Sequence, residues 1–305
     1  MMTHTVITSF STQGYEDYGA AFIQQFAKHW PAEVRLVIFH EWSPEQFDAM
    51  DRPGYRDNIE WRPVADAPHH DEWAMWIRRR ALLTGRLGNG GYDINFDAGM
   101  CRKIWFQHAG IKFYGGKVFW VDSDVYTHAD VPLEFLDDVL PDDKLCCYLG
   151  RERIYTESGF LGFNADHKFC VPFFHLYQSI PLTGAIFTLP GWHDCYAFDA
   201  ARSASPKNAA GEIETAYAES FVNLGAGLGD GGPGLQVFNS SILGAYMDHR
   251  KGARKGKPSP HDEMSVRRTE PYWQRDEPPV TLPAGLYEDH GPSAGESGDV
   301  WLQTR

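Results

Sequence analysis

The sequence predicts an α/β fold with a mostly parallel central sheet flanked by helices. Between positions 4 and 42 the residue pattern is that of a strand, a helix and a second strand, and two strands joined by a helix pair in parallel. The segment KVFWVDSD, residues 117–124, is apolar without alternation up to its aspartates, which is typical of a central strand buried on both faces. With 305 residues, 43% of them hydrophobic, the chain can bury a sizeable core.

The opening elements follow from residue type. HTVITSF (4–10) is β-branched and apolar, which favours a strand. Apolar residues recur at helical spacing over 19–30, and Pro31 ends that helix before a second strand at 34–42. The further elements expected before the central strand are a strand at 59–64 and helices at 72–87 and 98–110.

The second half of the chain is expected to hold shorter elements. They are short strands at 144–150 and 158–164, a helix at 209–223 and an ordered segment at 236–249. The glycine-rich stretch 225–234 suits neither a helix nor a strand and is expected to be a loop. From about residue 270 the chain becomes rich in proline, glycine and acids. We therefore expect one catalytic domain over 1–270 and a loosely held tail over 271–305.

Composition excludes several classes of protein. A net charge of −13 argues against a dedicated nucleic-acid binder. No apolar run is long enough to span a membrane, and the N-terminus lacks the pattern of a secretory signal. The five cysteines form no CxxC pair and are odd in number, which argues against a disulfide framework and a zinc-thiolate site. A cytoplasmic location fits these features best.

Two aspartates follow the central strand directly. Asp122 and Asp124 lie one residue apart at its carboxyl end, where ligands of open α/β sheets bind. Two carboxylates can reach one divalent cation there, and hard oxygen ligands suit Mg²⁺ or Mn²⁺. The alternative is a solvated polar turn with a helix cap.

A basic segment, HRKGARKGK at 249–257, stands out in this acidic chain and is expected to meet something anionic. It contains an H-x-x-G-x-x-K spacing formed by His249, Gly252 and Lys255. A histidine can ligate a metal, a glycine lets the backbone approach a phosphate, and a lysine supplies a point charge for it. The alternative is a basic solvated loop.

Together, the D-x-D and H-x-x-G-x-x-K motifs resemble the glycosyltransferases of the GT-A fold. They resemble especially the retaining family that includes glycogenin and the bacterial lipopolysaccharide galactosyltransferases, over roughly residues 3–257. This resemblance implies that Asp122, Asp124 and His249 hold Mn²⁺ or Mg²⁺. It also implies that the metal bridges the diphosphate of a nucleotide sugar, and that Gly252 and Lys255 contact the same diphosphate.

Looser matches concern the donor. The family's arginine beside the nucleotide corresponds to Arg102, with Lys103 next to it. The end of the first strand, Thr8 and Ser9, corresponds to the nucleobase site. These positions imply donor-binding roles.

Two further matches concern the sugar and imply the catalytic positions. In TESGFLGFN, Glu157 stands where the family has an asparagine that faces the sugar, so this chain departs from the pattern there. GWHDCYAFD offers His193 and Asp194 near the sugar.

The resemblance implies metal-dependent transfer of a sugar from a nucleotide diphosphate, with a UDP-sugar favoured, to an acceptor hydroxyl. A retaining enzyme needs no dedicated protein base, whereas an inverting enzyme would need a carboxylate, for which Asp194 is the candidate. The basic segment favours an anionic acceptor, such as a glycan core or a hydroxylated base in DNA.

Other classes remain as alternatives. A Mg²⁺-dependent phosphatase of the haloacid-dehalogenase type also has D-x-D at a strand end, but that motif normally follows the first strand. A nucleotidyltransferase would need basic residues after the first strand, where STQGYEDYG has none. A non-catalytic carbohydrate-binding protein is consistent with the 14% aromatic content, but it would need neither the metal motif nor the phosphate motif.

Overall fold

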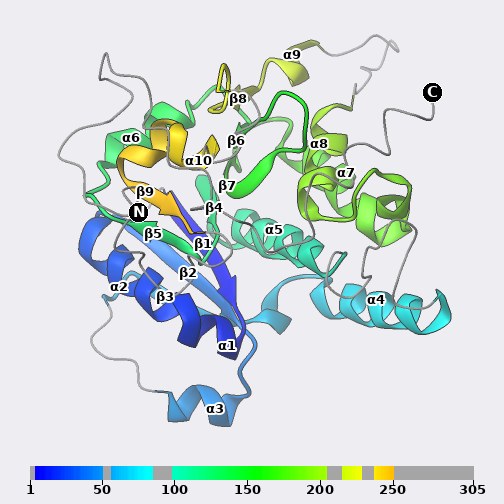
Figure 1. The fold of residues 1–305 in the computed structure, drawn as a ribbon, viewed down its shortest axis with the longest axis horizontal. Helices are drawn as coiled ribbons and strands as arrows, with labels where there is room; N and C mark the ends of the chain where they lie inside the picture. The colour runs from blue at the N-terminus through cyan, green and yellow to red at the C-terminus, as the bar shows by residue number, and fades with distance from the viewer. Residues whose placement is uncertain (1–3, 51–55, 85–97, 205–214, 229–236, 251–305) are drawn as a thin grey trace, which may run out of the picture.

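The fold is built on a seven-stranded central sheet. The computed structural model describes residues 4–50, 56–84, 98–204, 215–228 and 237–250 (Figure 1). From one edge to the other, the strands are β3 (Ile59–Pro63), β2 (Val34–His40), β1 (His4–Phe10), β4 (Lys117–Val121), β7 (Glu157–Asn164), β6 (Cys146–Leu149) and β8 (Phe221–Asn223).

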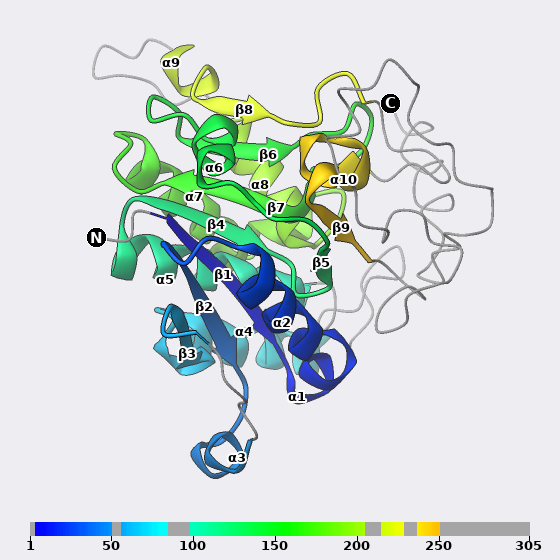
Figure 2. The same ribbon diagram turned by 90° about the vertical axis from the view of Figure 1, so that its left-hand side faces the viewer.

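The sheet is mostly parallel. Only β7 runs against its neighbours, β4 and β6, whereas the other four pairings are parallel. A separate antiparallel ribbon pairs β5 (Val125–Thr127) with β9 (Met247–His249), at the carboxyl ends of β1 and β4 (Figure 2). The predicted α/β class with a mostly parallel sheet is confirmed.

Helices cover both faces of the sheet (Figures 1 and 2). One face carries α4 (His70–Thr84), α5 (Arg102–Tyr114), α7 (Cys170–Thr183) and α8 (Asp194–Arg202). The other face carries α2 (Ala20–His29), α6 (Leu133–Val139) and α10 (Val237–Ser240). The remaining α-helices of the described residues are α1 (Thr12–Gly14), α3 (Pro44–Ala49) and α9 (Thr215–Ala218).

The two helical layers explain why β4 is apolar without alternation. Val118 and Trp120 pack into the core beneath α5, whereas Phe119 and Val121 pack into the opposite core beneath α2 and α6. Successive side chains of a strand point to opposite faces. Because both faces of β4 are covered by helices, every position in the strand faces a core. Helix α5 approaches the sheet closely at Gly110, where a Cβ would lie 1.8 Å from Ile7 Cδ1.

The prediction of a helix over 209–223 is wrong beyond Ala218. Helix α9 ends there, and residues 221–223 form the edge strand β8 instead. Parallel pairing with β6, in which Cys146 is opposite Phe221, satisfies this segment's backbone groups and outweighs its helical tendency.

Several predictions concern residues outside the described part of the chain. These are the tail 271–305, most of the glycine-rich loop 225–234, and Gly252 and Lys255 of the basic segment. Among the described helices, none has the length and apolar character needed to cross a membrane.

Candidate metal centre

The turn that joins β4 to β5 carries both predicted aspartates. Strand β4 ends at Val121, so Asp122 and Asp124 follow the strand rather than lie in it. The Asp122 amide donates to the Gly159 carbonyl of β7 at 2.9 Å, and the Val125 amide donates to the Asp122 carbonyl at 3.0 Å. These bonds fix the turn against the sheet and close it into a tight bend.

His249 reaches the turn through the ribbon. Strand β9 pairs with β5 so that His249 lies opposite Val125, and the Arg250 amide donates to the Asp124 carbonyl at 3.1 Å. The His249 amide donates to Asn239 Oδ1 at 2.9 Å. The pairing of β5 with β9 thereby holds His249 beside Asp124, although the two residues are more than a hundred positions apart in the sequence.

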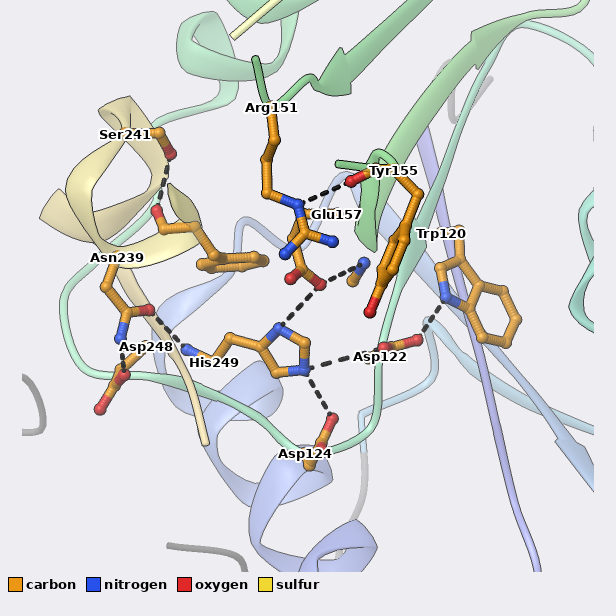
Figure 3. A network of polar contacts seen from close by, with 12 residues as sticks. Trp120, Asp122, Asp124, Arg151, Tyr155, Glu157, Asn239, Ser241, Asp248 and His249 are labelled. Carbon is orange, nitrogen blue, oxygen red and sulfur yellow. Dashed lines mark hydrogen bonds and ion pairs between the residues drawn. The ribbon is translucent and has the colours of Figure 1, made fainter. Parts of the chain in front are cut away.

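The three predicted metal ligands converge (Figure 3). One ligand atom from each of Asp122, Asp124 and His249 lies within 4.8 Å of the others. His249 Nε2 is 3.2 Å from Asp124 Oδ1 and 3.7 Å from Asp122 Oδ2. Two carboxylates and an imidazole form a donor set that suits Mn²⁺ or Mg²⁺.

The other oxygen of Asp122 is held from behind. Trp120 Nε1 donates to Asp122 Oδ1 at 2.7 Å, and Lys103 Nζ lies 2.8 Å from the same atom. With Oδ1 occupied by these two donors, Oδ2 is the oxygen turned toward His249. The carboxylate is therefore oriented before any ligand binds, which supports its fit to a metal.

The other ring nitrogen of His249 faces Glu157. Nδ1 lies 3.4 Å from Glu157 Oε1, an ion-pair contact that is longer than a well-formed hydrogen bond. The Gly159 amide donates to the same oxygen at 3.2 Å. A Cβ on Gly159 would lie 2.6 Å from His249 Cε1, so a glycine here makes room for the ring. Glu157, predicted to face the sugar, lies against the imidazole.

The imidazole is charged in this arrangement. Burial alone would lower the pKa of His249, but the carboxylates of Asp124 and Glu157 outweigh it and raise that pKa to about 9. A divalent cation between the carboxylates would replace the Nε2 proton and leave the Nδ1 side facing Glu157.

Lys103 links the turn to helix α8. Its Nζ lies 3.8 Å from Asp194 Oδ2 as well as beside Asp122. Burial opposes the charge of Lys103, but the two aspartates raise its pKa above its usual range. Burial raises the pKa of Asp194, which Lys103 counteracts. Asp194 is 2% exposed and lies behind Lys103.

The remaining predicted residues are less closely grouped. Arg102 does not contact the turn that carries Asp122 and Asp124; it pairs with Glu41 at 2.5 Å. Thr8 is fully buried at the end of β1. The Ser9 carbonyl accepts a hydrogen bond from Ser123 Oγ at 3.1 Å, which places the end of β1 against the D-x-D turn.

Three residues that support the centre were not predicted. Trp120 holds Asp122, Asn239 positions the His249 backbone, and Gly159 gives the ring space. The tryptophan two residues before the first aspartate and the glycine two residues after Glu157 were visible in the sequence. Their significance depends on the pairing of β4 with β7 and of β5 with β9, which residue type does not reveal.

The charge balance of the centre calls for a cation. Among the described residues, Asp122, Asp124, Glu157 and Asp194 bring four buried or half-buried carboxylates together, and Lys103 and His249 contact them. Carboxylates that outnumber nearby cations in a low-dielectric site repel one another. A divalent cation would relieve this repulsion.

Neither the comparison with protein-family models nor that with curated proteins gives a match. Solved structures similar to the chain include glycosyltransferases, the enzyme class that the motifs resemble. Mouse xyloside xylosyltransferase 1 shares 10% identity at a TM-score of 0.39, with 64% of this chain and 80% of that chain covered. The bifunctional glycosyltransferase WbbM shares 12% identity at 0.43, with 73% and 39% covered. The S. cerevisiae mannosyltransferase Ktr4p shares 10% identity at 0.43, with 65% of each covered. The match spans well under half of WbbM.

Proposed function

We propose that the chain is a metal-dependent glycosyltransferase that moves a sugar from a nucleotide diphosphate, with a UDP-sugar favoured, to an acceptor hydroxyl. The observation that carries this proposal is the convergence of Asp122, Asp124 and His249 within 4.8 Å of one another. This centre joins the D-x-D motif to the first residue of the H-x-x-G-x-x-K motif, as the sequence resemblance implies. A solvated polar turn would not account for a buried histidine held by Asn239 and an aspartate held by Trp120 and Lys103.

Each residue of the centre has a role in this proposal. Asp122, Asp124 and His249 would hold Mn²⁺ or Mg²⁺, which would neutralise the charge that develops on the departing diphosphate. Lys103 orients Asp122, and Glu157 orients the His249 ring. These two residues therefore act by positioning the ligands.

The donor would extend from the metal centre toward the first strand. Thr8 and Ser9 remain the proposed nucleobase positions, and Ser9 lies against the D-x-D turn through Ser123. Gly252 and Lys255 remain the proposed diphosphate contacts beyond β9. Arg102 is a weaker candidate than Lys103 for contact with the donor, because its guanidinium pairs with Glu41.

The retaining course is favoured. An inverting enzyme needs a carboxylate that can take the proton of the acceptor hydroxyl. Asp194, the candidate for that task, is buried and faces Lys103. That position suits an anchor for Lys103 better than a base that must meet an incoming acceptor. An anionic acceptor, attracted by the basic residues after His249, remains part of the proposal, and its binding should weaken with salt.

The first test is a thermal-shift panel of UDP- and GDP-sugars on the full chain, each with and without Mn²⁺. We expect a rise of several degrees for one donor that needs the metal and is abolished by EDTA, because ligand binding to the folded state raises the melting temperature. Hydrolysis or transfer of that sugar, followed by release of the nucleoside diphosphate, would then identify the enzyme. A protein that shifts with Mg²⁺ and a phosphomonoester but with no nucleotide sugar would be a phosphatase instead.

A further inference from the structure

The loop between β6 and β7 is anchored at both ends beside the metal centre. At its start, the Gly150 amide donates to Asn223 Oδ1 at 2.8 Å. At its end, the Thr156 amide and hydroxyl donate to the Asp199 carboxylate at 2.8 and 2.6 Å. A loop fixed in this way can hold its side chains in defined positions.

Arg151 is held in one orientation by its own loop. Its Nε donates to the Tyr155 carbonyl at 2.6 Å, and its guanidinium lies 4.4 Å from the centroid of the Tyr155 ring. Stacking and a hydrogen bond together fix the plane of the guanidinium. The Nη edge of the group is left facing away from the loop.

That edge has an unsatisfied donor. Arg151 Nη2 is excluded from solvent and has no hydrogen-bond partner among the described residues. A buried donor without a partner is costly, and for a charged group the cost is larger. A carboxylate or phosphate oxygen would satisfy this donor with a strong, charge-assisted hydrogen bond.

The guanidinium points into the candidate centre. Figure 3 shows the Arg151 guanidinium and the Tyr155 side chain directed toward the carboxylates of Glu157 and Asp122. Within the described part of the chain, Arg151 forms no ion pair with either carboxylate. An anion that enters between Arg151 and the metal ligands would find Arg151 Nη2 without a hydrogen-bond partner among the described residues.

We propose that Arg151, fixed by Tyr155, forms an oxyanion subsite for the donor beside the metal centre. This inference rests on the proposed function, because it takes the ligand to be a nucleotide sugar. The oxyanion is either a phosphate of the diphosphate or a carboxylate carried by the sugar, since the guanidinium fork matches both groups with two parallel hydrogen bonds. The subsite lies on the β6–β7 side of the centre, opposite the β5–β9 ribbon that delivers His249.

The test compares three variants of the full chain. Arg151→Met removes the charge but keeps much of the side-chain volume, and Arg151→Lys keeps the charge but loses the fork. Arg153→Met is the matched control, because Arg153 lies exposed on the same loop. Melting temperatures without ligand establish that all three fold.

Isothermal titration in Mg²⁺ uses three probes: inorganic pyrophosphate, UDP-glucose and UDP-glucuronate. If the subsite takes a phosphate, Arg151→Met should bind pyrophosphate at least tenfold more weakly than Arg153→Met, with Arg151→Lys between them. If it takes a sugar carboxylate, pyrophosphate binding should be unchanged, and the preference of the wild-type protein for UDP-glucuronate over UDP-glucose should be lost in Arg151→Met.

Two negative results have different meanings. In the first, the wild-type protein binds these probes with Mg²⁺, and Arg151→Met binds all three with the same affinity as Arg153→Met. That result would overturn the subsite and leave the proposed function standing. Wild-type protein that binds none of the three would remove the proposed function and, with it, this inference.

Discussion

The two ends of strand β4 carry the same residue types in different surroundings. At the amino end, Lys117 lies 2.5 Å from Asp137 and 2.8 Å from Asp142, and His4 lies 2.9 Å from Asp137. Just beyond the carboxyl end, Lys103 and His249 contact Asp122, Asp124, Glu157 and Asp194. Lysine, histidine and carboxylates make up both clusters.

The difference lies in which partner is buried. At the amino end the carboxylate side chains are 50% and 95% exposed, so water solvates them and they neutralise the buried ammonium of Lys117. At the carboxyl end the four carboxylates are between 3% and 18% exposed. Buried carboxylates in excess create a demand for a cation that exposed ones do not. Of the two clusters, therefore, only the one at the carboxyl end, whose acids are the less exposed partners, is a candidate metal centre.

The sharpest test of this comparison removes one carboxylate from each end. Asp124→Asn should abolish the Mn²⁺-dependent thermal shift and lower transfer activity by on the order of 10²-fold or more, because it removes a metal ligand. Asp142→Asn should leave both unchanged. Equal shifts for the two variants would mean that the carboxyl-end cluster holds no metal.

A smaller effect is expected from the carboxylate behind His249. Glu157→Gln should weaken Mn²⁺ binding by roughly 10–100-fold, since the loss of a group that orients a histidine ligand has this scale. Titration of the protein with Mn²⁺, followed by the electron paramagnetic resonance of the free ion, measures the affinity directly. If instead affinity were retained and only the KM for the donor rose, Glu157 would face the sugar, as the family pattern implies.

The space beneath the imidazole can be tested separately. Gly159→Ala should lower the free energy of unfolding by about 1–3 kcal/mol and weaken Mn²⁺ binding, because the added methyl group would overlap the His249 ring. Gly99→Ala is the control, since a Cβ there meets nothing within 4 Å. Denaturant unfolding of the metal-free protein gives the first quantity. An unchanged stability would show that the ring can move aside without cost.

The smallest effect is expected at the amino end. Asp137→Asn should lower stability by less than about 1 kcal/mol, because half-exposed ion pairs are screened by solvent. Burial would raise the pKa of Asp137, but hydrogen bonds from Lys117 and His4 lower it below its usual value of 3.8. The carboxylate therefore stabilises the fold above about pH 4 and loses this contribution as pH falls through its lower folded-state pKa. Denaturant unfolding gives the free energy of unfolding of wild type and variant at pH 7 and at pH 3. The two proteins should differ more at pH 7 than at pH 3. A difference that grew on acidification would contradict this assignment.

The sequence by itself predicted most of the sheet and the three residues that converge beyond β4 as candidate metal ligands. The early strands and the unalternating run of β4 were readable because residues buried on both faces must be apolar. Asp122 and Asp124 were readable because they interrupt that run at its carboxyl end, and His249 because of its spacing from Gly252 and Lys255.

Tertiary structure decided which neighbouring residue points into the centre. Arg102 and Lys103 are consecutive on α5, and successive residues of a helix point about 100° apart. Only the packing of α5 on the sheet turns Lys103 toward Asp122 and Arg102 toward Glu41. The orientation of Glu157 toward His249 depends in the same way on the register of β7 and β9. These side-chain orientations depend on contacts between segments far apart in the chain, and a local sequence pattern does not predict such contacts.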